Sequence, residues 1–179
     1  MNLNEYQQLA ARTLIDEPDH EITQQQWDMV TAVHHLFRRA NSISAVEHSS
    51  PGRWDMTAWD ITGLLGEVGE LVDVVKKDVF HQHPTHPDTY KKEIGDALWY
   101  WAACCTTAGY EAAAIAIYDS AANPFAYALA RFYRSLLGFV EAFMPFTLQA
   151  AGEMNIEKLK LRYPNGFDPG DSVKRVDVQ

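Results

Sequence analysis

Two pairs of acidic residues are set into apolar, helix-like stretches of this sequence. In "GLLGEVGELVDVVKK", residues 63–77, apolar side chains recur every three or four residues, which predicts a helix rather than a strand. Glu67 and Glu70 are three residues apart, so they project from one face of that helix. In "YKKEIGDALWYWAA", Glu93 and Asp96 repeat the spacing. The same carboxylate pattern therefore occurs on two successive predicted helices.

The connection between these helices is short and rich in proline. It reads "HQHPTHPD", in which Pro84 and Pro87 exclude one continuous helix and Asp88 is suited to cap the second. A loop this short predicts an antiparallel helix hairpin, in which the four carboxylates can face one another. Their heights match if the first helix ends near Lys77 or if the loop folds back, and the sequence leaves both open.

Glycines interrupt both helices beside the carboxylates. Gly63, Gly66 and Gly69 lie in the first helix and Gly95 in the second. An interior glycine costs a helix about 1 kcal/mol relative to alanine. Such glycines suit a place where another backbone, a metal or a phosphate comes close. A solvated acidic stripe is the alternative interpretation of the glutamates, and it leaves the glycines unexplained.

Four facing carboxylates require counter-charge, because buried like charges repel strongly. All-oxygen ligands suit Mg²⁺ or Mn²⁺ rather than zinc, and magnesium commonly combines a few carboxylates with water and substrate phosphate. Lys77 lies seven residues after Glu70 and hence on the carboxylate face, where it can neutralise phosphate charge. The sequence thus predicts phosphate chemistry at a metal site made of Glu67, Glu70, Glu93 and Asp96.

Almost all of the remaining sequence also predicts helix, and hence an all-α bundle built around the carboxylate hairpin. Thr23 and Gln26 form a capping box for a helix that precedes a polar loop, "NSISAVEHSSPGR". We expect one domain over residues 1–179, with 166–179 as a tail. The other expected helices cover residues 3–14, a short alanine-rich stretch after Gly109, an aromatic-rich stretch from the break at Asn123–Pro124 to about Phe143, and about Leu148 to Tyr163.

The last predicted helix carries hydrogen-bond donors on one face. In "NIEKLKLRYP", Asn155, Lys158 and Arg162 share that face. An exposed basic surface is the alternative interpretation of this segment. The face that we expect to be buried carries Ile156, Leu159 and Tyr163.

Composition and local patterns exclude several other classes of protein. The net charge of -9 argues against a nucleic-acid-binding surface. "MNLNEYQQLA" does not have the pattern of a signal peptide, and no apolar run is long enough to span a membrane. Cys104 and Cys105 are adjacent, which favours reduced thiols over a disulfide. We therefore expect a soluble, cytoplasmic protein.

Histidines and aromatic residues give weaker signals. His81, His83 and His86 lie in the proline-containing loop, where we expect them to be solvated rather than to bind metal. The aromatic set is expected to lie mostly in the core, although one or two members can stack on a base. It comprises Trp54, Trp59, Trp99, Tyr100 and Trp101.

Four segments taken in order resemble the MazG-like all-alpha nucleoside triphosphate pyrophosphohydrolases. They are "NEYQQLAARTL", "GLLGEVGELVDVVKKDVFHQH", "YKKEIGDALWYWA" and "NIEKLKLRYPNGF", and together they cover about half of the chain. The resemblance implies Mg²⁺-dependent hydrolysis of nucleoside triphosphates to monophosphate and pyrophosphate, in the removal of unwanted nucleotides. It implies metal ligation by Glu67, Glu70, Glu93 and Asp96, triphosphate contacts from Lys77, Asn155, Lys158 and Arg162, and catalytic roles for Glu67, Glu70 and Lys77.

The sequence departs from the family pattern in two places. Many members carry glutamate where this chain has Gly66, which leaves the general base and the number of metals open. Residues 109–155 are extended relative to the family. Because they are rich in large apolar residues and family members are commonly oligomers, we expect a homodimer interface there, with burial inside one chain as the alternative.

Two other function classes fit the sequence less well than this enzyme. A non-catalytic helical protein that binds nucleotides is favoured only by Gly66. A di-iron carboxylate bundle requires Glu-x-x-His pairs, and neither acidic pair has a histidine at the required place.

Overall fold

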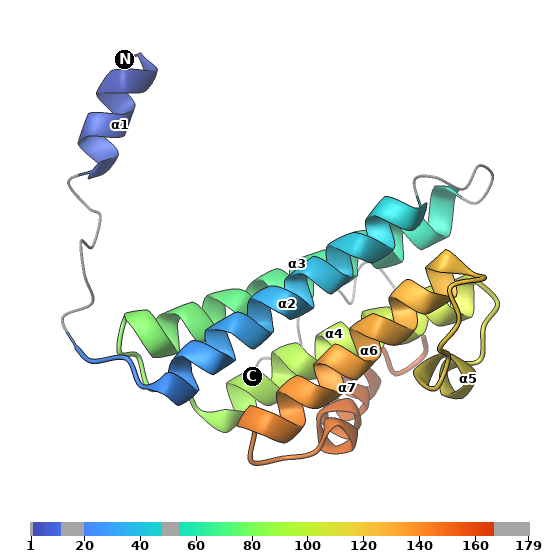
Figure 1. The fold of residues 1–179 in the computed structure, drawn as a ribbon. Helices are drawn as coiled ribbons and strands as arrows, with labels where there is room; N and C mark the ends of the chain where they lie inside the picture. The colour runs from blue at the N-terminus through green and yellow to red at the C-terminus, as the bar shows by residue number, and fades with distance from the viewer. Residues whose placement is uncertain (1, 12–19, 48–53, 167–179) are drawn as a thin grey trace.

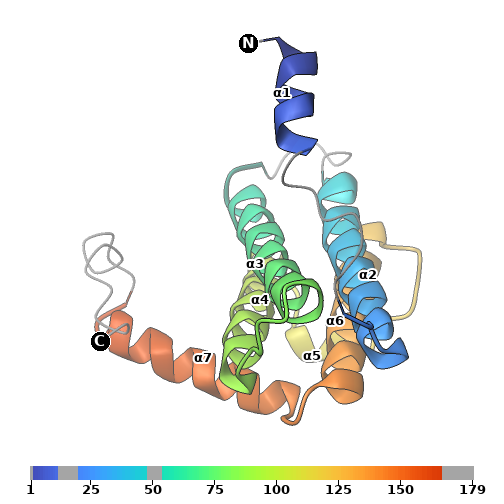
Figure 2. The same ribbon diagram turned by 90° about the vertical axis from the view of Figure 1, so that its left-hand side faces the viewer.

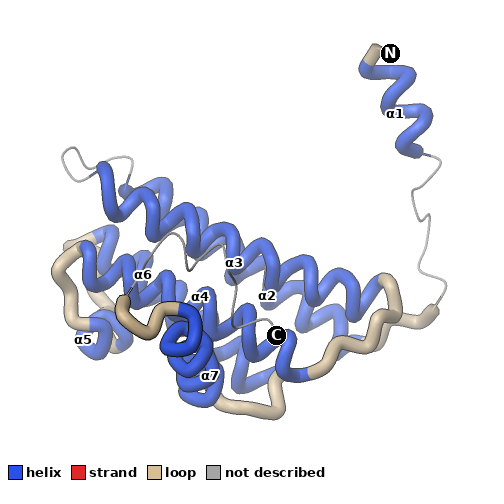
Figure 3. The backbone as a smooth tube through the Cα atoms, turned by 180° about the vertical axis from the view of Figure 1, so that it is seen from behind, coloured by secondary structure: helices blue, strands red, loops and turns tan. Residues whose placement is uncertain are grey.

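The computed structural model describes residues 2–11, 20–47 and 54–166, without the side chains of Glu47 and of residues 54–57. Within this part of the chain every named element is a helix, as predicted, and Figure 3 shows only helix and loop. No described helix combines the length and apolar character needed to cross a bilayer. The helices are α1 (Leu3–Ala11), α2 (Gln24–Glu47), α3 (Trp54–Phe80), α4 (Pro87–Thr107), α5 (Ala112–Ala116), α6 (Pro124–Phe143) and α7 (Leu148–Arg162).

Helices α2, α3, α4 and α6 form the bundle, α7 packs chiefly against α4, and α5 packs against α6. Figure 1 shows α2 beside α3 and α6, while α7 projects beyond the bundle in Figure 2. Helix α1 has no buried residue and lies away from the bundle in both views. The predicted helix over residues 3–14 is confirmed as far as Ala11, and its remainder, like most of the predicted tail, lies outside the described residues.

Helix α2 begins at the predicted capping box and is longer than expected. The Thr23 backbone N–H donates to Gln26 Oε1 at 2.9 Å, and the Gln26 N–H donates to Thr23 Oγ1 at 3.3 Å. The predicted polar loop is wrong for residues 41–47, which continue the helix. Ile43 is fully buried there and extends the apolar stripe by another turn, which outweighs the polar character of its neighbours. Trp27 and Phe37 flank this stripe and are partly exposed.

The hairpin of α3 and α4 is closed by a loop that folds back, which is one of the two predicted alternatives. The backbone N–H groups of His81 and His83 both donate to the Lys77 carbonyl, at 3.2 and 3.1 Å. The predicted cap at Asp88 is wrong. His86 is the N-cap, and its Nδ1 accepts a hydrogen bond from the Asp88 N–H at 3.2 Å. Pro87 takes the first helical position, for which its fixed φ is suited.

Helix α6 is buried inside a single chain by packing on α2 and α4. The indole N–H of Trp101 on α4 donates to the Leu129 carbonyl at 3.0 Å and ties the two helices together. The large apolar residues therefore pack within the bundle of one chain, and a homodimer interface at α6 stays a prediction. The buried large residues of α6 are Leu129, Phe132, Leu136, Phe139 and Val140.

Two of the four glycines beside the carboxylates permit close packing. A Cβ atom on Gly95 would lie 2.6 Å from the Ala151 carbonyl oxygen, so α7 approaches α4 backbone to backbone. On Gly63 it would meet the Tyr100 ring at 2.0 Å. At Gly66 and Gly69 a Cβ would meet no protein atom within 4 Å, so packing within the chain does not require glycine there.

Candidate metal and nucleotide site

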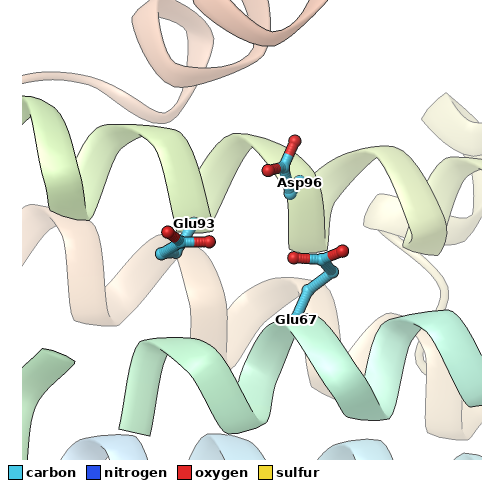
Figure 4. Close-up of side chains that lie close together, drawn as sticks. All are labelled: Glu67, Glu93 and Asp96. Atoms are coloured by element: carbon cyan, nitrogen blue, oxygen red, sulfur yellow. The ribbon is translucent and has the colours of Figure 1, made fainter. Parts of the chain in front are cut away.

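Three carboxylates meet between α3 and α4. Glu67 on α3 and Glu93 and Asp96 on α4 each offer an oxygen, and these oxygens all lie within 4.8 Å of one another. Figure 4 shows the Glu67 side chain reaching from α3 toward α4, where Glu93 and Asp96 lie one turn apart. The three-residue spacing and the hairpin together produce this acidic cluster, which we define as Glu67, Glu93 and Asp96.

Glu70, the fourth predicted ligand, lies outside the acidic cluster. Its side chain is exposed, one turn of α3 beyond Glu67. It is near enough for its negative charge to raise the pKa of both Glu67 and Glu93. The structure thus brings together three of the four predicted ligands and leaves Glu70 at their margin.

Helix α7 reaches the acidic cluster through two side chains. Asn155 Nδ2 and Lys158 Nζ both donate to Asp96 Oδ1. Asn155 is buried, whereas Ile156, expected on the buried face, is 46% exposed. That face prediction is wrong because the small residues of α7, rather than its large ones, meet α4.

Two buried oxygen atoms of this site are left unsatisfied. Lys92 Nζ pairs with Glu93 Oε1 at 2.7 Å, which accounts for only one oxygen of that carboxylate. In the part of the chain that the structure describes, Glu93 Oε2 and Asn155 Oδ1 are buried without a hydrogen-bond partner. Buried polar atoms are normally paired, and an ion is one explanation for such exceptions.

The protonation of the cluster is strongly perturbed. Burial, followed by the negative charge of Asp96, raises the pKa of Glu67 from 4.5 to about 7. Burial also raises the pKa of Glu93, although Lys92 opposes the shift. Without a cation, burial and the neighbouring negative charges therefore disfavour the ionised forms of Glu67 and Glu93.

These residues fit a divalent cation. The donors are carboxylate oxygens, which Mg²⁺ and Mn²⁺ prefer, and Glu93 presents an oxygen that no protein group satisfies. Ligands of one magnesium ion lie about 2.0–2.1 Å from it, so small side-chain rotations bring oxygens spread over 4.8 Å into range. The acidic cluster can therefore hold an ion once Lys158 and Lys92 yield part of their contacts.

A cavity of about 740 Å³ opens beside the cluster and is lined by α3, α4 and α7. Glu67 and Asp96 form part of its wall, together with the predicted donors Asn155, Lys158 and Arg162. Lys77 does not line it and instead pairs with Asp73 at 2.6 Å on the exposed surface of α3. Lys77 follows Glu67 by ten residues, about 15 Å along the helix, so it lies away from the cavity although it shares the carboxylate face.

The sequence interpretation missed several members of this wall. Trp59 and Trp99, expected mostly in the core, are 66% and 40% exposed and line the cavity with Tyr100. Trp99 and Tyr100 follow Asp96 by three and four residues, so helical spacing alone would have placed them on its face. Of the described members of the aromatic set, Trp101 is the buried one. Lys92, the partner of Glu93, was also missed.

Residues 60–124 match the family model of the MazG nucleotide pyrophosphohydrolase domain. This segment of the chain is similar to that domain. The predicted resemblance is thereby confirmed over the segment that carries the acidic cluster and Glu70. Neither a curated protein nor a solved structure matches the chain. The MazG-like match ends before α7, so Asn155, Lys158 and Arg162 are joined to the site by the fold rather than by the match.

The raised pKa of Glu67 predicts an unusual pH dependence of stability. In EDTA, folded protein holds a proton on Glu67 up to about pH 7, whereas the unfolded chain releases it near 4.5. The contribution of Glu67 to the free energy of unfolding is therefore fully present below pH 4.5 and is lost as the pH rises through 7. Because Glu67 is partly solvated, we discount this contribution. Between pH 5 and 8 we expect the free energy of unfolding of the parent to fall by about 1–2 kcal/mol more than that of Glu67→Gln.

Urea unfolding of both proteins at several pH values measures this difference. Comparing the two cancels the titration of the histidines, which both share. Equal pH slopes for parent and Glu67→Gln would contradict the expectation.

Proposed function

We propose that this protein is a divalent-metal-dependent nucleoside triphosphate pyrophosphohydrolase that releases a nucleoside monophosphate and pyrophosphate and clears unwanted nucleotides. The observation that carries the proposal is the acidic cluster, with its unsatisfied Glu93 oxygen. It lies at the edge of a cavity lined by basic side chains and aromatic rings. The MazG-like domain supports the reaction class.

In this proposal Glu67, Glu93 and Asp96 hold Mg²⁺, or Mn²⁺ in its place, and Glu70 approaches as a further ligand. Such an ion, when bound, neutralises phosphate charge and lowers the pKa of water. Glu67 and Glu70 are the candidates to accept the proton of the attacking water. The pKa of Glu67, about 7 without a cation, shows how strongly the site disfavours uncompensated negative charge.

The donors of α7 bind the triphosphate. Lys158 and Arg162 line the cavity beside the cluster. Their positive charges stabilise the negative charge that develops on the departing pyrophosphate. Asn155 fixes the orientation of Asp96 through its hydrogen bond. Lys77, for which a catalytic and phosphate-binding role is predicted, pairs with Asp73 and does not line the cavity.

The aromatic wall offers a surface for the nucleoside. Trp59, Trp99 and Tyr100 line the same cavity as the cluster, and Trp99 packs edge-to-face on Tyr100 with centroids 4.8 Å apart. The volume of about 740 Å³ lies within the range of about 300–1,000 Å³ typical of small-molecule sites. A base stacked on these rings leaves the phosphates directed toward the α7 donors.

An assay of pyrophosphate release tests the proposal. We expect purified protein to release pyrophosphate from at least one nucleoside or deoxynucleoside triphosphate with Mg²⁺ or Mn²⁺, and to lose this activity in EDTA. Release of single phosphates would contradict the reaction. Nucleotide binding without turnover across a panel that includes modified nucleotides would instead support the non-catalytic alternative, which the absence of a glutamate at Gly66 favours.

A further inference from the structure

A second cavity, of about 270 Å³, lies between α2 and α6. It shares no lining residue with the cavity of about 740 Å³ beside the acidic cluster, which is lined by α3, α4 and α7. Figures 1 and 2 show α2 and α6 side by side, with α7 on the other side of α4. The polar wall is made by Arg39, Ser42 and Arg131, and the apolar wall includes Val46, Tyr127 and Ala128.

Two half-buried arginines, Arg39 and Arg131, line this cavity. Among the side chains that the structure describes, no carboxylate forms an ion pair with Arg39 or Arg131. None of the described residues that line the cavity is acidic. The contrast with the whole chain is sharp, since 24 acidic residues are available to 15 basic ones.

The two guanidinium groups also disfavour each other. Burial, and after it the charge of Arg131, lowers the pKa of Arg39. Arg131 lies over the Tyr127 ring at 5.5 Å from the centroid, a cation–π contact that orients it without neutralising its charge. An anion between the two groups would relieve this repulsion.

We propose that the Arg39–Arg131 cavity binds the phosphate group of a small phosphorylated organic molecule. Guanidinium groups present paired N–H donors that match phosphate oxygens. Pro124 also lines the cavity at the first turn of α6, so the positive end of that helix dipole adds to the field. The apolar wall of Val46, Tyr127 and Ala128 accepts the organic part of the ligand.

This binding requires no metal, because the described wall of the cavity supplies positive charge and offers no carboxylate ligand. It is therefore separable from the proposed hydrolysis, which depends on the acidic cluster. A negative result in the pyrophosphate assay would not contradict phosphate binding at this second cavity. A failure to bind phosphate there would equally not contradict the proposed hydrolysis.

Calorimetric titration of the full chain in EDTA and a phosphate-free buffer tests the site, with phenyl phosphate and inorganic phosphate as probes. We expect phenyl phosphate to bind more tightly, because the apolar wall contacts its ring. Arg39→Gln and Arg131→Gln should each weaken it about tenfold or more. Arg38→Gln is the matched control on the same helix, because Arg38 is exposed, and it should change the affinity by less than about twofold.

Three results would overturn the proposal. They are no binding of either probe to the parent, equal affinities for both probes, and loss of binding on Arg162→Gln rather than on Arg39→Gln, which would place the ligand in the larger cavity. Thermal unfolding without ligand guards against misfolding. Because each substitution removes a repulsive charge, Arg39→Gln and Arg131→Gln should unfold no earlier than the parent.

Discussion

A Glu93→Gln variant is expected to lose pyrophosphate release by a factor of about 10²–10³ or more. Glu93 is only 6% exposed and presents a buried oxygen that no described group satisfies, so a cation is its natural partner. Glutamine keeps the shape of the side chain and removes the charge. We therefore expect the variant to fold normally and to gain little stability from Mg²⁺, whereas the parent is stabilised by it.

Glu141→Gln is the matched control, because Glu141 is an exposed glutamate on α6 and lines neither cavity. Steady-state kinetics and thermal unfolding with and without Mg²⁺ measure both effects. A Glu93→Gln enzyme with parental kcat/KM would remove the acidic cluster from the catalytic centre. Glu70→Gln, tested in parallel, reports whether the exposed Glu70 joins the cluster during turnover.

A Gly95→Ala variant is expected to be less stable than the parent by about 1–3 kcal/mol. Replacement of a helical glycine by alanine ordinarily stabilises a protein by about 0.5–1 kcal/mol, so the predicted sign is reversed. The reason is the backbone contact of α4 with α7, where the new methyl group would lie 2.6 Å from the Ala151 carbonyl oxygen. A main-chain atom cannot rotate away as a side chain can.

Gly69→Ala supplies the opposite sign on the neighbouring helix, since a Cβ there meets no atom within 4 Å. Urea unfolding of the two variants should place them on either side of the parent. Activity should fall in Gly95→Ala as well, because α7 carries Asn155 and Lys158 to Asp96. If both substitutions stabilise the protein, the close packing of α7 on α4 is wrong.

The acidic cluster could be predicted from the sequence because two local rules determine it. Three-residue spacing places Glu93 and Asp96 on one face of α4, and the proline-containing loop makes α4 return along α3, where Glu67 lies. Helix boundaries that depend on local caps, such as Thr23 and Asn123, were equally readable.

The remaining features depend on how the helices pack, which local patterns do not determine. Sharing the carboxylate face did not place Lys77 at the cavity, because only the part of α3 around Trp59 to Glu67 faces α7 across it. Hydrophobicity could not distinguish the cavity wall at Trp59 and Trp99 from core, because the same residue types serve both. The helical conformation of residues 41–47 depends on burial of Ile43 against neighbouring helices, so the polar composition misled the prediction.

Helix α7 is anchored chiefly on α4 and buries only Leu148, Ala151 and Asn155. The same helix supplies Lys158 and Arg162 to the cavity. In the proposed enzyme, the free energy of seating α7 is then part of the free energy of binding substrate, and the apparent affinity scales with the fraction of molecules in which α7 is seated. Substitutions in the contact between α7 and α4 would raise KM while leaving the carboxylates intact. In steady-state kinetics alone, such a rise in KM would look like the direct loss of a phosphate contact.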